Sequence, residues 1–194
     1  HLFGIPTPMN DLASVARGVG ASLIEDAAQG LGGTCEGRKL GTLGDFGLFS
    51  FGRGKPLPLG GGGALIGSGE IEESLISGPT SSGYLDLARA ASSRFLSHKR
   101  IYGVLEALPL GLGETIFNPD FLIKPMSRAQ QGLGTSSLSE LQSLNEHRNA
   151  TASIYHEILN DSDRLHVHSP DKAVFTRYPF MAGMNPIPEA LRRL

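Results

Sequence analysis

The sequence predicts an α/β fold in which helices cover the faces of an open sheet. Apolar residues recur at helical spacing over residues 10–20, and a short apolar run follows directly at residues 21–24. A second short apolar run, residues 47–51, also has the length and flanking turn residues of a buried strand. A helix followed by two buried strands is typical of α/β sheets.

The elements of the first half follow from local patterns. We predict a helix over residues 10–20, with Asn10 as its N-cap and Gly20 at its end. The turn-rich residues 32–41 predict a surface hairpin. Residues 60–63 are four glycines, which either allow a close backbone approach near the site or form a flexible connector. A strand is expected at residues 64–66.

The second half reads mainly as helix. A short helix is predicted at residues 70–77, and apolar residues recur mostly at helical spacing over residues 84–105. The clearest helix covers residues 139–159, which carry one apolar stripe. Strands are expected at residues 165–167 and 173–181.

Composition excludes several classes of protein. The chain has 194 residues, 40% of them hydrophobic, which is enough for one sizeable core. The formal net charge is -2 and no basic run exceeds two residues, so we expect no nucleic-acid partner and no binding to anionic lipid. No apolar stretch approaches the roughly 20 residues that span a bilayer, and no signal peptide is visible.

The single cysteine and the histidines do not indicate a metal site. Cys35 has no second cysteine to pair with, which fits a reducing cytoplasm, and it has no partner at metal-ligand spacing. His166 and His168 alternate with apolar residues, as on a half-exposed strand. We therefore expect a cytoplasmic protein without a metal ion.

Polar side chains follow the two predicted buried strands. Asp26 and Gln29 come after the first, and Ser50 and Lys55 lie at and just beyond the end of the second. The carboxyl ends of strands form the ligand crevice of an open α/β sheet. A lysine amine can form a Schiff base with an aldehyde, and a carboxylate can keep a pyridine nitrogen protonated, so this set favours pyridoxal 5′-phosphate. Taken singly, each residue has a simpler explanation, such as a turn role for Asp26.

Three blocks carry a resemblance to a known family. They are Glu25–Gln29 (EDAAQ), Phe49–Lys55 (FSFGRGK) and Gly62–Ala64 (GGA), and His1–Gly4 (HLFG) precedes them. In order and spacing these blocks resemble the DegT/DnrJ/EryC1/StrS sugar aminotransferases, which depend on pyridoxal 5′-phosphate and have the aspartate-aminotransferase fold, fold type I. Several blocks at fixed spacing are far more specific than one short pattern.

The resemblance implies a domain organisation. Residues 1–137 would be the C-terminal part of an incomplete large cofactor-binding domain, residues 138–160 a connecting helix, and residues 161–194 the start of a small α+β domain. Both ends of the chain look cut, and about the first third of a family member would be missing, including its phosphate-binding turn and the residue that stacks on the ring.

The resemblance also implies a role for each site residue. Asp26 would pair with the pyridinium nitrogen, Gln29 would contact the ring hydroxyl, Ser50 would bind the phosphate, and Lys55 would hold the aldehyde and shuttle the proton. The implied reaction moves an amino group from glutamate or glutamine to a nucleotide-linked keto-sugar, in polysaccharide, lipopolysaccharide or secondary-metabolite sugar biosynthesis. The implied assembly is a homodimer.

The chain departs from the family pattern at several positions. Gly61 stands where an acid is usual, and Pro56 replaces an asparagine after the lysine. Ile123 and Pro125 stand where the pattern before Met126 has an asparagine and an arginine, and residues 84–125 are unlike the family segment. Lys99 and Lys124 are candidates to replace the lost phosphate contact, although either can be an ordinary surface lysine.

Two alternative functions stay open. The first is a regulatory homologue without turnover, with or without bound cofactor, which the lost asparagine favours. The second is a pyridoxal-phosphate-dependent sugar dehydratase, whose branch has histidine in place of the lysine. Lys55 argues against this second alternative.

Overall fold

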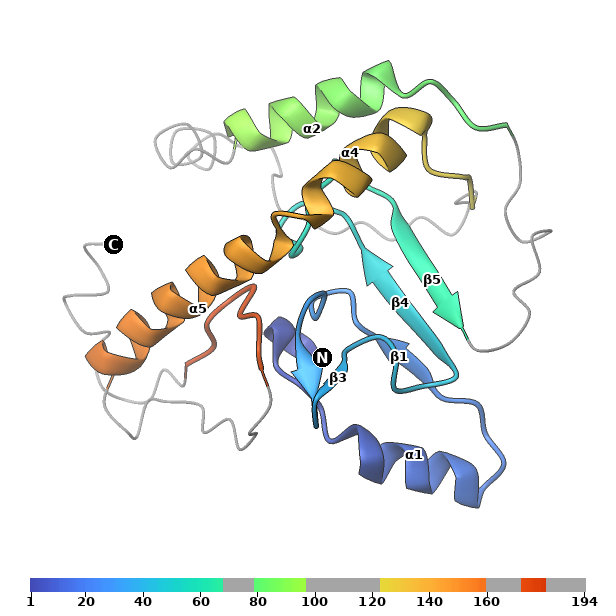
Figure 1. Ribbon diagram of the computed structural model, residues 1–194, viewed down its shortest axis with the longest axis vertical. Coiled ribbons are helices and arrows are strands. Elements are labelled where there is room, and N and C mark those ends of the chain that lie inside the picture. Colours follow the sequence, from blue (N-terminus) through green and yellow to red (C-terminus); the bar gives the residue numbers. More distant parts are fainter. Residues whose placement is uncertain (68–78, 97–122, 160–171, 181–194) are drawn as a thin grey trace, which may run out of the picture.

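The structure confirms an α/β fold built on a small mixed sheet. This computed structural model describes residues 1–67, 79–96, 123–159 and 172–180 (Figure 1). Strands β1 (Ile24–Asp26), β4 (Phe46–Ser50) and β5 (Gly63–Gly67) form a sheet in the order β1-β4-β5. β1 is parallel to β4, and β5 is antiparallel to it.

The first strand begins later than predicted. The prediction of a strand at residues 21–24 is wrong, because β1 starts at Ile24, which is 66% exposed. Before that point, Leu23 donates its N–H to Oδ2 of Asp45, 2.7 Å away, and its carbonyl accepts the N–H of Asp45. The ladder to β4 starts only where Phe46 comes opposite Ile24. The buried side chain of β1 is therefore a charged one, that of Glu25.

Strand β4 buries one of its two faces. Gly47 and Phe49 are buried, whereas Leu48 is 43% exposed, so the second predicted run is a strand but only half of it faces the core. Phe49 packs in the core cluster with Met9, Ala27, Cys35 and Leu40. A Cβ at Gly41 would lie 2.1 Å from Cζ of Phe49, so this turn fits only glycine.

Helix α1 (Met9–Gly18) starts without the predicted cap. The prediction of Asn10 as N-cap is wrong, because the helix begins after Pro8, and Asn10 instead donates from its amide to the carboxylate of Glu36. Gly20 does follow the helix, with φ of 66° and its N–H bonded to the carbonyl of Arg17. Apolar side chains of α1 remain exposed within the described structure, among them Val15 at 67%.

The predicted hairpin is present and packs one side on the core. β2 (Thr34–Cys35) and β3 (Arg38–Lys39) pair antiparallel. Although the charged residues of this hairpin lie at the surface, Cys35 and the adjacent Leu40 are 3% and 2% exposed.

Three longer helices follow the sheet in the chain. α2 (Tyr84–Leu96) falls within the predicted helical stretch, whose remaining residues lie outside the described ranges. α5 (Leu141–Ile158) is the predicted long helix, but α4 (Arg128–Leu138) was not predicted. Figure 1 shows α2 beside α4, and α4 and α5 following one another along one diagonal.

The segment 172–180 is not the predicted strand. Only Phe180 of the described residues 172–180 has strand-like pairing, so the prediction of a strand at 173–181 is wrong there. Val174 and Thr176 donate their N–H groups to Gly4 and Phe3 in the 3-10 helix η1 (Leu2–Gly4), but Phe175 between them has φ of 30°, which breaks an extended backbone. The predicted helix 70–77, the predicted strand 165–167, His166 and His168 lie outside the described residues. The domain division stays a prediction.

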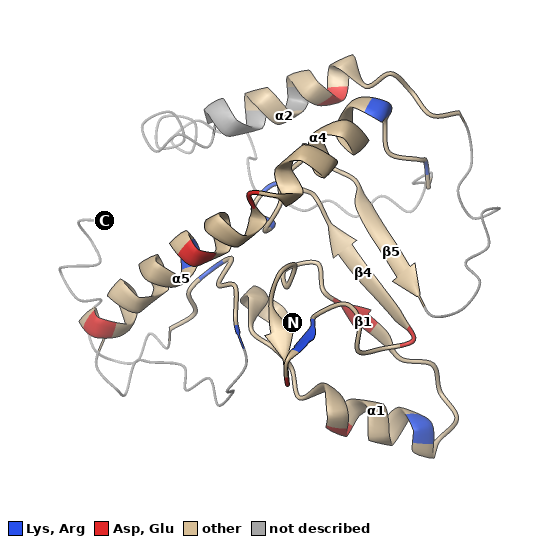
Figure 2. Cartoon of the chain, in the orientation of Figure 1, with Lys and Arg blue, Asp and Glu red and all other residues tan. Residues whose placement is uncertain are grey.

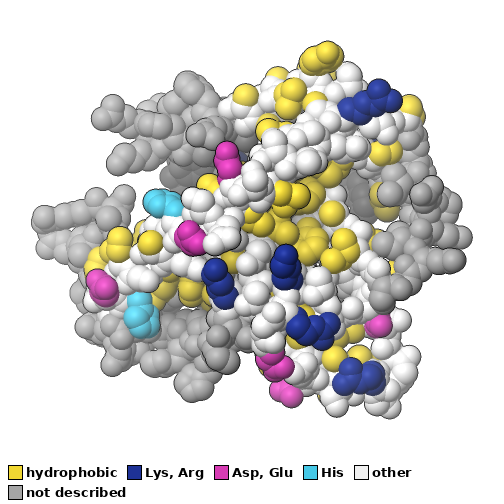
Figure 3. Space-filling view, in the orientation of Figure 1, with side chains coloured by type: hydrophobic (Ala, Val, Ile, Leu, Met, Phe, Trp, Pro, Cys, Tyr) yellow, Lys and Arg dark blue, Asp and Glu magenta, His cyan; other side chains and the backbone are white. Residues whose placement is uncertain are grey.

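The charged residues of the described elements are dispersed, as Figure 2 shows. No helix within the described ranges is long and apolar enough to cross a membrane. The described residues contain no group of three His, Cys, Asp or Glu side chains that could hold a metal ion. In Figure 3 hydrophobic side chains gather in the middle of one face, below α4, with Lys and Arg side chains beside them.

Candidate functional site

The candidate site lies at the carboxyl edge of the parallel pair β1 and β4. Asp26 ends β1 and is opposite Leu48, two residues before Ser50, the last residue of β4. Because the strands are parallel, both ends reach the same sheet edge. Gln29 and Lys55 lie in the turns that follow these two strands.

Asp26 combines a local contact with a free oxygen. Its exposed side chain accepts the N–H of Ala28 through Oδ1 at 3.0 Å, as an Asx turn does, and its backbone carbonyl accepts from the backbone nitrogen of His1 at 3.1 Å. Within the described residues no hydrogen bond engages Oδ2. One carboxylate oxygen therefore remains available to a ligand.

Glu25 is a buried carboxylate that the sequence analysis did not single out. Its side chain is nearly fully buried and accepts from four donors. Oε1 accepts from Nε2 of His1 at 2.8 Å and from the N–H of Gly41, and Oε2 accepts from the N–H groups of Leu43 and Gly44 at 2.7 and 3.3 Å. A buried charge needs such pairing. The signal in the sequence was an acid directly after the apolar run at residues 21–24.

His1 connects this carboxylate to the start of the chain. Its Nδ1 accepts the N–H of Thr7 at 3.0 Å, so the ring proton lies on Nε2 and is donated to Glu25. The imidazole and backbone of His1 thus hold both Glu25 and Asp26. They brace the strand end that carries the candidate carboxylate.

Gln29 is held by contacts to its carbonyl oxygen. Oε1 accepts the N–H of Phe3 at 3.1 Å, and Oγ1 of Thr176 lies 3.3 Å from the same oxygen. The amide nitrogen of Gln29 has no hydrogen bond within the described residues. Its N–H groups are therefore available as donors.

Ser50 ends β4, and Lys55 lies in the tight loop that follows. Oγ of Ser50 accepts the N–H of Gly52 at 3.4 Å, and the N–H of Lys55 bonds to the carbonyl of Gly52 at 3.3 Å. The side chain of Lys55 is half-buried. The loop closes where Phe51 accepts the N–H of Leu59 at 2.9 Å.

Helix α5 anchors this loop through Arg148. Its guanidinium donates to the carbonyl of Pro56 at 2.9 Å and to Oδ1 of Asn145 at 2.7 Å. Desolvation by burial lowers the pKa of Arg148 from its ordinary value. The residue that follows the candidate lysine, Pro56, is itself buried, so this departure from the family pattern is a packed position.

The glycine run makes close contacts and requires positive φ. Gly60, Gly61 and Gly62 have φ of 80°, 137° and 84°. A Cβ at Gly60 would lie 3.0 Å from Cβ of Ala90 in α2, and one at Gly62 would lie 3.0 Å from Cγ of Met126. Gly60 and Gly62 are therefore packed against neighbouring residues, which does not fit the expectation of a flexible connector. An acid at position 61 would be strained, which explains the glycine there.

Of the two lysines that could replace the lost phosphate contact, only Lys124 lies within the described residues, where no hydrogen bond joins it to the site. Ile123 is 53% exposed, and Lys124 is exposed. Lys99 lies outside the described ranges. The structure therefore assigns neither lysine to the lost phosphate contact.

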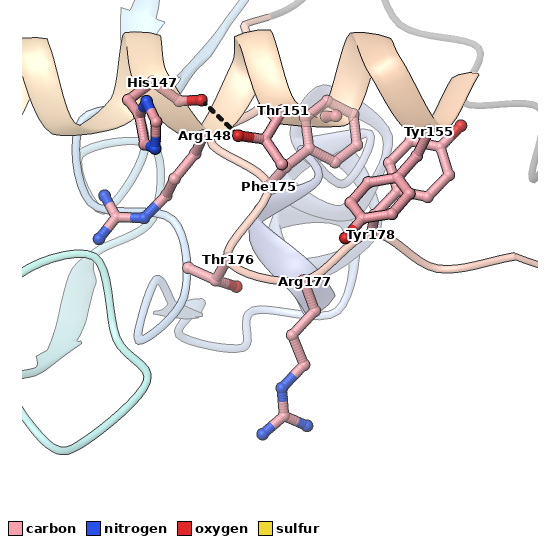
Figure 4. A pocket seen from close by; sticks show the side chains of 9 residues that line it. His147, Arg148, Thr151, Tyr155, Phe175, Thr176, Arg177 and Tyr178 are labelled. Carbon is pink, nitrogen blue, oxygen red and sulfur yellow. Dashed lines mark hydrogen bonds between the residues drawn. The ribbon is translucent and has the colours of Figure 1, made fainter. Parts of the chain in front are cut away.

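A pocket that the sequence did not indicate lies between α5 and residues 172–180. Its volume is about 290 Å³ (Figure 4). The centroid of the Tyr178 ring lies 5.5 Å from that of Tyr155 and 5.7 Å from that of Phe175. The lining residues are His147, Arg148, Thr151, Ala152, Tyr155, Phe175, Thr176, Arg177 and Tyr178.

Comparison with known proteins identifies relatives over nearly the whole chain. The sequence model of the DegT/DnrJ/EryC1/StrS aminotransferase family matches residues 1–186 of this chain. L-glutamine:2-deoxy-scyllo-inosose aminotransferase of Streptomyces kanamyceticus is 28% identical over 190 residues, which is 95% of this chain and 40% of that protein. UDP-N-acetyl-3-dehydro-alpha-D-glucosamine 3-aminotransferase of Acidithiobacillus ferrooxidans is 36% identical over 72 residues, 37% of this chain and 20% of that protein.

A solved structure of a protein from the same family is similar to this chain. The crystal structure of a DegT DnrJ EryC1 StrS aminotransferase from Brucella abortus has a TM-score of 0.60 and 25% identity, covering 91% of this chain and 41% of that one. The chain thus spans less than half the length of the relatives it matches.

Proposed function

The chain belongs to the DegT/DnrJ/EryC1/StrS aminotransferase family, and on this premise we propose that the protein transfers an amino group from glutamate or glutamine to a nucleotide-linked keto-sugar. The observation that carries the proposal is the position of Asp26 and Ser50 at one sheet edge, with Gln29 and Lys55 in the turns that follow. The names of two relatives support the substrate classes, since one contains L-glutamine and the other a UDP-linked dehydro-sugar.

The donor set fits pyridoxal 5′-phosphate. Asp26 offers a free carboxylate oxygen, Gln29 an amide NH₂ group, Ser50 a hydroxyl and Lys55 a half-buried amine. These match a pyridine nitrogen, a ring oxygen, a phosphate and an aldehyde. When bound, this cofactor supplies an electron sink that stabilises a carbanion.

Each residue then has a defined task. Asp26, oriented by the Ala28 N–H, holds a proton at the pyridine nitrogen through its second oxygen. Ser50 binds phosphate through its hydroxyl, beside the N–H of Gly52. Lys55 would hold the cofactor through its amine, in place of the aldehyde oxygen, which leaves as water, and would act as acid and base on the substrate proton. Arg148 keeps the loop of Lys55 in place by binding the next carbonyl.

We extend the proposal to the whole protein from which these residues come. It works in the cytoplasm as a homodimer, and residues 1–137, 138–160 and 161–194 belong to its large domain, connecting helix and small domain. Its product enters polysaccharide, lipopolysaccharide or secondary-metabolite sugar biosynthesis. The support for these points is family membership.

Covalent trapping tests the proposal. The chain is incubated with saturating pyridoxal 5′-phosphate, reduced with borohydride, digested and analysed by mass spectrometry. We expect one modified peptide, carrying the adduct on Lys55, and none from Lys55→Ala. Lys39→Ala is the matched control, because Lys39 is an exposed lysine on β3, and it should keep the adduct. Labelling that is spread over surface lysines and unaffected by Lys55→Ala contradicts the proposal.

A second candidate function rests on Ile123. This exposed apolar residue stands where the family pattern has an asparagine, which favours a homologue that binds cofactor without turnover. The aminotransferase and the regulatory homologue are expected to differ in the first half-reaction, in which the amino donor becomes a keto acid. An aminotransferase converts glutamate or glutamine to the keto acid once per bound cofactor, whereas a regulatory homologue carries the same Lys55 adduct and forms no keto acid.

A further inference from the structure

We propose that Thr176 is a positioning residue that fixes the direction of the Gln29 amide, so that Gln29 acts only as a hydrogen-bond donor toward the cofactor ring. The part of this inference that concerns the cofactor rests on the proposed function. The part that concerns the amide rests on the contacts of Gln29 alone. No role for Thr176 follows from the motifs of the sequence.

The orientation of the amide follows from its partners. A backbone N–H can only donate, so the Gln29 atom 3.1 Å from the nitrogen of Phe3 must be the carbonyl oxygen. Oγ1 of Thr176 lies 3.3 Å from the same oxygen, and its hydroxyl therefore donates to it. An sp² oxygen has two lone pairs, and both are taken.

The free end of the Gln29 amide, its NH₂ group, can then only donate hydrogen bonds. The NH₂ group donates and does not accept, so it stabilises an ionised ring oxygen and gives nothing to a hydroxyl that needs an acceptor. A hydrogen bond to the charged form of a group favours that form. Gln29 held in this orientation lowers the pKa of the ring oxygen that it meets.

Three hydrogen bonds to η1 and α5 hold the backbone segment that carries Thr176. Its N–H donates to the carbonyl of Phe3 at 3.0 Å, and the N–H of Val174 donates to the carbonyl of Gly4 at 3.1 Å. Nδ2 of Asn149, on α5, donates to the carbonyl of Ala173 at 3.0 Å. The hydroxyl of Thr176 is thus aimed at Gln29 by the backbone on which it sits.

Gly4 makes this close approach possible. It has φ of 83°, and a Cβ there would lie 2.8 Å from Cγ2 of Val174 and 2.9 Å from the backbone carbonyl oxygen of Gln29. Only glycine lets the strand-end turn and the segment 172–176 meet at this point. Figure 4 shows Thr176 on the segment that faces α5 across the pocket.

The first test needs no cofactor. In an amide NMR spectrum of the protein without cofactor, we expect Thr176→Val to move the side-chain NH₂ signals of Gln29, since it removes the hydroxyl and keeps the shape. Thr176→Ser should leave them near their original positions. Thr151→Val is the matched control, because Thr151 lines the same pocket but donates only to His147 on its own helix. Gln29 signals unmoved by Thr176→Val overturn the inference.

The second test measures the ring oxygen. The visible absorption of bound pyridoxal 5′-phosphate is titrated with pH, and we expect the midpoint to rise by about half a pH unit in Thr176→Val, because one modest hydrogen bond to the charged form is weakened. Gln29→Ala should raise it at least as far, and adding Thr176→Val to Gln29→Ala should then change nothing more. An equal rise in both backgrounds shows that Thr176 acts without Gln29 and overturns the inference.

The two tests also separate this inference from the proposed function. If the unsubstituted chain shows no cofactor spectrum while Thr176→Val still moves the Gln29 signals, the proposed function fails and the positioning role stands. If cofactor binds and neither readout responds to Thr176→Val, the cofactor assignment stands and the positioning role fails.

Discussion

Asp26 can combine a turn role with the proposed role of a cofactor ligand, because a carboxylate has two oxygens. Oδ1 accepts the N–H of Ala28 and orients the group, and Oδ2 stays without a partner in the described residues. The local contact is therefore what aims the second oxygen.

Replacing this carboxylate separates binding from chemistry. In the whole protein we expect Asp26→Asn to lower the rate of amino transfer by about 100-fold or more, because an amide lacks the charge that keeps a ring nitrogen protonated. Cofactor affinity, from equilibrium dialysis, should fall by less than about tenfold, since the shape and the Ala28 contact are retained. Asp11→Asn, an exposed acid on α1, is the control and should change neither. Equal losses of rate and affinity would mark Asp26 as structural.

Helix α4 supports the glycine run next to the lysine loop. Ser127 accepts the N–H of Gln130 at its N-terminus, and the Gln130 side chain reciprocates, forming a capping box. The Gln130 amide also lies 3.4 Å from the carbonyls of both Leu59 and Gly61. The buried side chain of Gln130 thus takes part in the N-terminal cap of α4 and also contacts the end of the loop that carries Lys55.

Removal of the N-cap of α4 should measurably lower the stability of the protein. We expect Ser127→Ala to lower the free energy of unfolding by about 1 kcal/mol, the usual cost of losing an N-cap, and somewhat more because Ser127 is buried. Urea unfolding followed by circular dichroism gives the value. Ser136→Ala, within the same helix and exposed, should cost far less. Similar losses in the two variants would show that the capping box does not matter.

The molecule as a whole leaves apolar side chains uncovered. Val15 on α1, Val19 directly after α1 and Ile24 on the sheet are 67%, 75% and 66% exposed within the described structure. The chain also spans only 40% of its Streptomyces kanamyceticus relative. These side chains are available for contacts with another protein surface.

These 194 residues alone should bind cofactor weakly. Ser50 is the one phosphate ligand that the motifs assign to them, whereas phosphates are normally held by several backbone N–H groups at a helix N-terminus. We expect equilibrium dialysis against pyridoxal 5′-phosphate to give an affinity at least about tenfold lower than that of the Streptomyces kanamyceticus relative, and size-exclusion chromatography to show self-association. Equal affinity in the two proteins would show that the residues described suffice for the site.

The sequence by itself determined what covalent order and local pattern can specify. The family follows from motifs whose spacing is written in the chain, and the helices over 84–96 and 141–158 and the hairpin at 34–39 follow from periodicity and turn residues. The four site residues were named at this level, and their roles stay predictions. The start of α4 was also readable, because Ser127 and Gln130 have capping-box spacing.

Only the tertiary structure decided which distant groups meet. His1 reaches Glu25 across 24 residues, and Thr176 reaches Gln29 across 147. The late start of β1 likewise depends on where Asp45 and Phe46 lie. The need for glycine at position 61 depends on its φ of 137°. No local pattern encodes such contacts, since hydrogen bonds and steric limits act between atoms that the fold brings within about 3 Å of each other.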